Sequence, residues 1–194
     1  MQSENIKLAY LVSRYPAISH TFILREILHL KSKGFDISVA SVNNPDRPDE
    51  NLTEEEKLEA QKTYYIKKDG FGGAFRAHFS VVADHPFKYF KGLIYALSLG
   101  KTDLRKIVYG LFYFIEAVML GFWMENRGCK HLHVHFATPA STVALIAKKI
   151  FDLTFSITVH GPDEFYNVEN YLLREKIAGS EFICCIGSFA RSQL

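Results

Sequence analysis

The stretch Thr158-Val159-His160-Gly161-Pro162-Asp163-Glu164-Phe165 contains an apolar run that stops abruptly at polar residues. The alternating, β-branched residues that end at Val159 predict a strand. Glycine can adopt unusual backbone angles and proline cannot extend a sheet ladder, so we expect the strand to end at His160. Polar groups at a sharp turn after a strand are typical of the carboxyl edge of an α/β sheet, where such folds bind ligands.

Strand and helix signals alternate in the N-terminal part of the chain. Residues 6–13 predict a strand, residues 21–33 an amphipathic helix and residues 35–42 a second strand. We expect Thr21 to cap the helix and Gly34 to end it. This order, with short connections, predicts a right-handed parallel βαβ unit.

The same alternation continues to the C-terminus. Residues 43–62 are acidic and poor in large apolar groups, which predicts a surface excursion, and a short third strand follows at 63–66. Residues 71–126 predict helices inserted between the third and fourth strands, with a break near Pro86. Further strands are expected at 131–136, 155–159 and 182–186, with helices at 141–151, 171–178 and from 188 onwards. We therefore predict one α/β, Rossmann-like domain over residues 1–194, with a mainly parallel sheet and helices on both faces.

Composition limits the classes of function. The 194 residues suffice for one domain, and a net charge of +2 without a recognised binding module argues against nucleic acid. Three cysteines form neither a disulfide framework nor a CxxC pair, which fits a reducing compartment. The N-terminus lacks the basic start and apolar core of a signal peptide. These features predict a cytoplasmic protein.

Three histidines are spaced two residues apart on the predicted fourth strand: His131, His133 and His135. On a strand all three project from one face, so they form either a metal site, a substrate-contacting edge or a row bonded to neighbouring side chains. No Asp, Glu or Cys follows closely to complete a metal shell, and we expect no metal. His135, nearest the carboxyl end, is the candidate for contact with substrate.

His160 is the candidate catalytic residue, because the end of the strand places it in the crevice. A neutral imidazole there can form a hydrogen bond with a sugar hydroxyl, or accept and donate a proton near pH 7. Asp163 could orient it or bind substrate hydroxyls, although an acidic residue before a helix is often only a cap. The structural alternative is a turn histidine with a capping aspartate.

The loop after the first strand lacks the GxGxxG pattern, so a dinucleotide phosphate has no glycine-built cradle there. Ser19 and Thr21 stand instead at a helix N-terminus, where amides and hydroxyls can bind polar ligands. We take both as candidate substrate-binding residues. Plain helix capping is the alternative for Thr21.

Residues 67–124 hold most of the aromatic excess together with many lysines and arginines. Such a surface could lie on anionic lipid. The stretch 107–124 is long enough to raise a membrane-spanning interpretation, but Glu116 lies in its middle and Gly110 and Gly121 interrupt it. A helix packed against the sheet is the preferred interpretation.

Four motifs in this order resemble a known family. The first is Tyr15–Ile27, where the family often reads YPxxSETFIxxE and His20 stands in place of the usual acid. The other three, with the family's pattern in brackets, are His131–Ala137 (HxHAHFA, with Val134 for the alanine), Thr158–Phe165 (TxHGxDIF) and Ile186–Phe189 (ISxF). Together they are similar to the N-terminal half of a glycosyltransferase of the GT-B fold, family 4. The similarity is to the branch that builds bacterial exopolysaccharides and related surface glycans.

The resemblance implies a two-domain enzyme that transfers a sugar from a nucleotide-sugar to a glycan or lipid-linked acceptor. Transfer in this family retains anomeric configuration and usually needs no metal, and the nucleotide-sugar is a substrate, so no cofactor is expected. The resemblance places His160 near the transferred sugar and Ser19, Thr21 and His135 along the cleft.

The second domain, with the acidic E-x7-E motif of the sugar-donor site, is expected to be absent from this chain, as a missing part or a separate polypeptide. The chain alone is then expected to be inactive. The resemblance implies a cytoplasmic protein that is peripheral at the inner face of the cell membrane.

Two rival functions follow from the residues alone. One is a small metallohydrolase that uses His131, His133, His135 and His160. The other is a non-catalytic lipid-surface module built on residues 71–124. Bound zinc would favour the first rival, and binding to anionic vesicles would favour the second.

Overall fold

Six strands form one sheet in the computed structural model, which describes residues 7–161 and 163–194. They run in the order β3-β2-β1-β4-β5-β6, and each neighbouring pair is parallel. This confirms the predicted α/β class and its parallel sheet. The strands are β1 (Lys7–Arg14), β2 (Asp36–Asn43), β3 (Tyr64–Tyr65), β4 (His131–His135), β5 (Thr154–Val159) and β6 (Ile183–Cys185).

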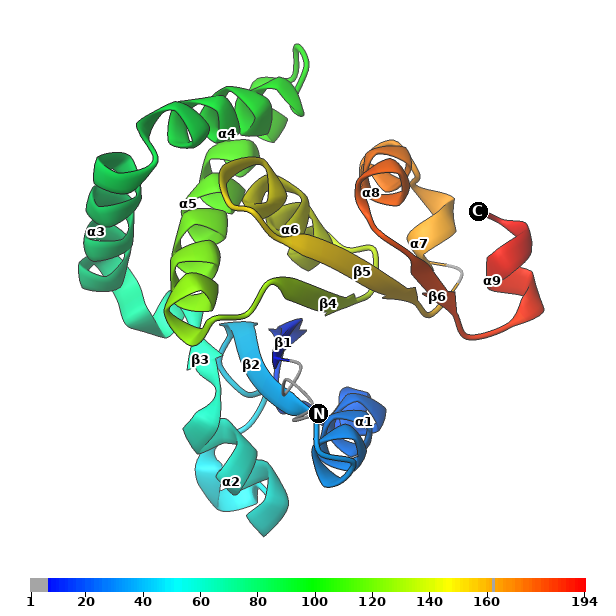
Figure 1. Cartoon of the computed structure of the whole chain (residues 1–194). Coiled ribbons are helices and arrows are strands. Elements are labelled where there is room, and N and C mark those ends of the chain that lie inside the picture. The colour runs from blue at the N-terminus through cyan, green and yellow to red at the C-terminus, as the bar shows by residue number, and fades with distance from the viewer. Residues whose placement is uncertain (1–6, 162) are drawn as a thin grey trace, which may run out of the picture.

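Helices cover both faces of the sheet, as predicted (Figure 1). Helices α5 and α6 pack on one face, and α1 packs on β2 from the other. The helices are α1 (Thr21–Ser32), α2 (Glu54–Lys62), α3 (Ile66–Asp84), α4 (Pro86–Ser98), α5 (Leu104–Arg127), α6 (Pro139–Ile150), α7 (Asp163–Tyr166), α8 (Leu173–Gly179) and α9 (Ser188–Ser192). Short 3-10 turns are η1 (Ile18–His20) and η2 (Asp49–Asn51).

The strand alternation divides the core into two layers. Ala9 and Leu11 of β1 join the cluster under α5 and α6, whereas Tyr10 and Val12 join the cluster under α1. Strand β4 lies beside β1, so its histidines share the side of the sheet that carries Tyr10. Because the chain leaves β1 toward β2 on one side and returns through β4 on the other, the crevice outside their carboxyl ends is the expected ligand position.

Helices α3, α4 and α5 occupy the predicted insertion between β3 and β4, with the break at Pro86. Among the described residues α5 is the one helix long and apolar enough to cross a membrane, but 50% of its most apolar window is buried. A Cβ at Gly110 would lie 2.4 Å from the carbonyl oxygen of Ala96, and one at Gly121 would lie 2.0 Å from the Phe151 ring. The glycines in α5 are therefore close-packing positions of a core helix.

The segment 43–62 lies at the surface, as predicted, but it is more ordered than its composition suggests. It contains α2, which begins with a capping box between Thr53 and Glu56. The carboxylates of Glu56 and Glu59 are buried, and they pair with Arg47 at 2.5 Å and Lys31 at 2.7 Å. These ion pairs, together with the buried Leu52, hold the segment in place.

Candidate functional site

The histidines of β4 form a hydrogen-bonded ladder with the hydroxyls of β5. His131 bonds to Thr154 through Nδ1 (2.7 Å) and to Ser156 through Nε2 (2.9 Å). His133 bonds to Ser156 through Nδ1 (2.8 Å) and to Thr158 through Nε2 (2.9 Å). The prediction that these histidines share one face is confirmed. Both have the structural role of bonding to neighbouring side chains.

Burial keeps these imidazoles neutral. It lowers the pKa of His133 to about 4, and the electrostatic coupling to the adjacent His135 imidazole acts in the same direction. One group among the described residues has ligand atoms close enough for a metal ion: Glu26, His133 and His135, within 4.8 Å of one another. Both ring nitrogens of His133 are already engaged by hydroxyls, so this group does not present a free set of lone pairs.

His135 connects a carboxylate to His160. Its Nδ1 lies 2.9 Å from Nε2 of His160, and its Nε2 lies 3.6 Å from Oε1 of Glu26. The neighbouring imidazole of His135 is the largest cause that lowers the pKa of Glu26, so this carboxylate is charged. A charged carboxylate favours the proton of His135 on Nε2, and His135 Nδ1 then accepts from Nε2–H of His160. The lone pair of His160 is thereby assigned to Nδ1.

His160 directly follows the last residue of β5, as predicted, and lies among aromatic rings. Its ring centroid is 4.4 Å from that of Phe136 and 4.9 Å from that of Phe22. Burial, followed by the electrostatic coupling to the adjacent His135 imidazole, lowers the pKa of His160 to about 4. At neutral pH the imidazole is therefore uncharged, and it acts as a hydrogen-bond acceptor and not as an acid that supplies protons.

Two buried charges fix the loops that carry these rings. Glu164 accepts hydrogen bonds from the backbone N–H groups of His160 (2.6 Å), Gly161 (3.0 Å) and Ala137. Lys176, also fully buried, donates to the carbonyl oxygens of Ala137 (2.9 Å) and Thr138 (2.8 Å).

These contacts hold Phe136 in the left-handed region, at φ 69°, which non-glycine residues rarely adopt. The strained backbone aims the Phe136 ring at His160.

The other predicted site residues lie at the same edge with fewer contacts. Ser19 and Thr21 are exposed beyond the end of β1, and no hydrogen bond of either side chain is recorded among the described residues. The expectation that Thr21 caps α1 was wrong, because the N-cap is His20, whose side chain makes no capping bond. The side chain of Asp163 lies outside the described residues.

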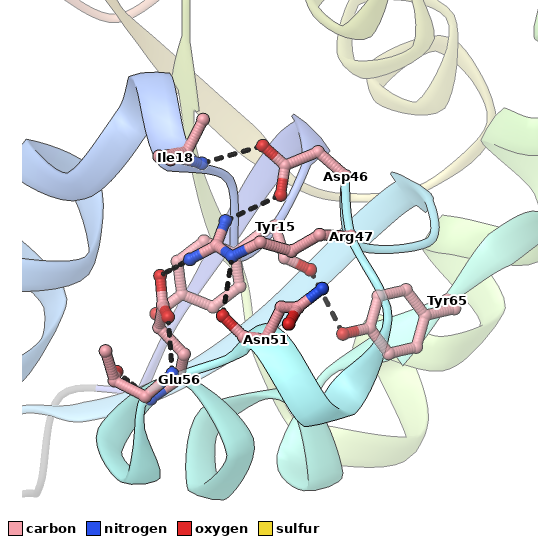
Figure 2. Close-up of polar contacts among 8 residues, drawn as sticks. Tyr15, Ile18, Asp46, Arg47, Asn51, Glu56 and Tyr65 are labelled. Atoms are coloured by element: carbon pink, nitrogen blue, oxygen red, sulfur yellow. Dashed lines mark hydrogen bonds and ion pairs between the residues drawn. The ribbon is translucent and has the colours of Figure 1, made fainter.

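The loop before η1 is held by the segment that precedes α2 (Figure 2). Ile18 donates its backbone N–H to Asp46 at 2.8 Å, and Arg47 bridges Asp46 and Glu56. Tyr65 donates its hydroxyl to the carbonyl of Tyr15 at 3.0 Å. The positions of Ser19 and His20 therefore depend on residues far along the chain.

A cavity of about 550 Å³ opens at the same carboxyl edge, on the α5 side of the sheet. Its polar lining includes Ser13, Asn43, Thr138 and Glu116. Burial raises the pKa of Glu116, whose charged neighbour is Lys67 at 4.0 Å. No hydrogen bond to this carboxylate is recorded among the described residues, so it is available to a ligand that donates hydroxyl or amine hydrogens.

Several of these residues were not singled out from the sequence. Glu26 ends the first motif and Glu164 lies in the third, and both could have been recognised there as carboxylates next to candidate histidines. Phe136, Lys176 and Glu116 carry no local signal, because their roles arise only when distant elements meet.

The chain was compared with protein-family models, curated proteins and solved structures, and none of them matches it.

The neutral histidines predict a loss of stability in mild acid. The pKa of His133 is about 4 in the folded chain and near 6.5 when unfolded, so the unfolded chain binds more protons between these values. The unfolding free energy should therefore fall as the pH drops from 6.5 to 4, by on the order of 3 kcal/mol for His133 alone. Thermal melts at pH 7.5, 6 and 5 measure this. A His133→Gln variant, which cannot titrate, should show a shallower pH dependence, and equal slopes would contradict the assignment.

Proposed function

We propose that this domain is the acceptor-binding half of a retaining glycosyltransferase of the GT-B type. The complete enzyme would transfer a sugar from a nucleotide-sugar to a glycan or lipid-linked acceptor, with a second domain that holds the nucleotide-sugar. The observation that carries the proposal is the neutral His160, backed by His135 and Glu26 at the carboxyl edge of the sheet. The four sequence motifs support the same function.

His160 would act on the transferred sugar as an oriented acceptor. Its Nδ1 lone pair can receive a hydroxyl of that sugar, while its Nε2–H is held by His135. The charge of Glu26 favours this tautomer from 3.6 Å, a distance too long for a hydrogen bond to Nε2 of His135. An acceptor with a pKa near 4 remains uncharged and correctly oriented at every physiological pH.

The cavity beside Glu116 would hold the acceptor. It lies on the other side of the loop Phe136–Thr138 from His160, since Phe136 contacts His160 and Thr138 lines the cavity. A half-buried carboxylate that lacks a recorded hydrogen-bond donor suits the hydroxyls of a sugar. Tyr109 and Tyr113, which are stacked at the cavity rim, offer aromatic surfaces to the C–H faces of a sugar ring.

Binding of oligosaccharides to this chain tests the role of Glu116. We expect saturation-transfer NMR with a panel of glucose-, galactose- and mannose-containing oligosaccharides to detect at least one that binds. Glu116→Gln should weaken that binding by about 10-fold or more, because hydrogen bonds to charged groups contribute ~1.5–3 kcal/mol.

Glu125→Gln is the matched control, since Glu125 lies on the same helix and its neighbour is the His85 ring at 3.7 Å, outside the cavity. Loss of binding in Glu116→Gln alone would support the proposal. Equal binding by both variants would place the acceptor elsewhere and contradict it.

The metallohydrolase alternative rests on the Glu26, His133 and His135 group. It makes a different prediction for protein purified without added metal. One tightly held zinc per chain, measured by elemental analysis, would contradict the transferase proposal. Zinc below one-tenth of the protein concentration would remove the alternative.

A further inference from the structure

Helix α3 has its large and small residues on unexpected sides. Gly73 and Ala77 are buried on its inner side, where it packs on α5. Phe71, Phe75 and Phe79, spaced four residues apart, are 98%, 75% and 70% exposed. A helix of a soluble protein normally turns its large apolar side chains to the core. The middle of the core side is small, with Ile66 and Val81 buried near its two ends, and the outer side is a row of phenylalanines.

Helix α4 repeats this arrangement. Its buried residues are Gly92 and Ala96, and a Cβ at Gly92 would lie 2.3 Å from Ile150 of α6, so the inner side must be small. Phe87 is 90% exposed and Ile94 is 68% exposed on the outer side. The close packing of α4 accounts for the glycine and alanine. It does not account for the exposed phenylalanine and isoleucine.

The exposed side chains of these two helices form what we call the phenylalanine face. Helices α3 and α4 both pack on α5, and α4 lies on the outer side of the α5–α6 layer (Figure 1). Helix α3 also contacts β2. So many large exposed apolar side chains on neighbouring helices mark a surface for a partner or a membrane. The face consists of Phe71, Phe75, Phe79, Phe87, Phe90 and Ile94.

Positive charge accompanies the phenylalanine face. Between residues 67 and 112 the sequence has eight lysines and arginines against three aspartates, although the whole chain is only +2. Two such faces would repel each other, which disfavours a second copy of the chain as the occupant. The exposed cations include Lys68, Arg76, Lys91, Lys101, Arg105 and Lys106.

We propose that the phenylalanine face binds the surface of an anionic lipid bilayer. The phenylalanines and Ile94 would enter the boundary between headgroups and acyl chains, and the cations would contact anionic headgroups. The helices would lie in the plane of the membrane, since α3 and α4 keep their inner sides on α5. This inference rests on the exposed side chains alone and does not depend on the proposed transferase activity.

Vesicle cosedimentation tests the proposal with the whole chain. We expect binding to phosphatidylcholine vesicles that contain 30% phosphatidylglycerol (about one lipid in three, a strongly anionic surface), and weaker binding to pure phosphatidylcholine or in 0.5 M salt (roughly a 4–5 Å Debye length). The double variant Phe75→Ser/Phe87→Ser should raise the lipid concentration for half-maximal binding about 10-fold or more. Both side chains are at least 75% exposed, so the fold does not depend on them.

Tyr166→Ser is the matched control, because Tyr166 is 82% exposed on α7, outside the phenylalanine face. It should bind vesicles like the unmodified chain. Absence of vesicle binding, or equal binding by the double variant and the control, would overturn the proposal. Self-association that the double variant abolishes, without vesicle binding, would instead assign the face to contacts between copies and would also overturn it.

Discussion

His160→Ala should lower the rate of sugar transfer by about 100-fold or more, in an assay that supplies the nucleotide-sugar domain. Removing one oriented hydrogen-bonding group from a transition state costs roughly 10²–10³ in turnover. His160 stands at the end of β5 with its Nε2 hydrogen bonded to His135, so alanine removes both the acceptor and the contact that orients it. The fold should survive, since the ring lies between Phe22 and Phe136 at the edge of the sheet rather than in either core cluster.

His131→Ala is the control for this prediction. Its ring is bonded to Thr154 and Ser156 within the ladder, so the change should lower the melting temperature and leave the turnover of the folded protein nearly unchanged. A His160→Ala enzyme with normal turnover, next to a His131→Ala enzyme with none, would mean that the site belongs to β4 rather than β5.

Glu164→Ala should cause the largest loss of stability among the site variants. The change leaves the N–H groups of Ala137, His160 and Gly161 without their acceptor. It also removes the carboxylate whose charge favours the protonated form of buried Lys176, a side chain whose pKa burial lowers to about 7. Unsatisfied buried groups cost ~1–3 kcal/mol each. We therefore expect a loss of about 3 kcal/mol or more and a melting temperature lower by roughly 6–12 °C.

Glu169→Ala provides the comparison, because this carboxylate is exposed a few residues further along the chain. Its melting temperature should stay within about 2 °C of the unmodified chain. Glu164→Gln should fall between the two, since an amide oxygen can still accept hydrogen bonds but carries no charge. If Glu164→Ala melts like Glu169→Ala, Glu164 does not fix the loops as described.

The fold could be predicted because its signals are local. Alternating apolar residues located β1, β2, β4 and β5, and Pro86 located the break between α3 and α4. The spacing of the β4 histidines also placed them correctly on one face, because a strand alternates with a strict period of two. What the histidines do depended on β5, whose hydroxyls stand opposite them in register.

Less of the candidate site than of the fold could be predicted from the sequence. The few apolar residues of 43–62 indicate its surface position but not helix α2, which buried ion pairs help to hold in place. The sequence pattern ends a strand at Phe136, yet the left-handed backbone there turns the ring toward His160. In the sequence, Glu116 is only a charge that argues against a membrane span. Its cavity exists because α5 crosses the carboxyl edge of the sheet, and no local pattern encodes that crossing.

The ladder between β4 and β5 has a collective property that no single histidine shows. Each hydroxyl has one proton to donate, and each neutral imidazole donates through one nitrogen and accepts through the other. Ser156 serves both His131 and His133, so the direction of one hydrogen bond sets the direction of the next. A proton added to either ring turns its accepting nitrogen into a donor, so the hydroxyl that donated to that nitrogen must turn and accept instead. When that hydroxyl is Ser156, its bond to the other histidine is affected too, so acid acts on the two rings together, in a row that ends at Thr158, next to the strand terminus that carries His160.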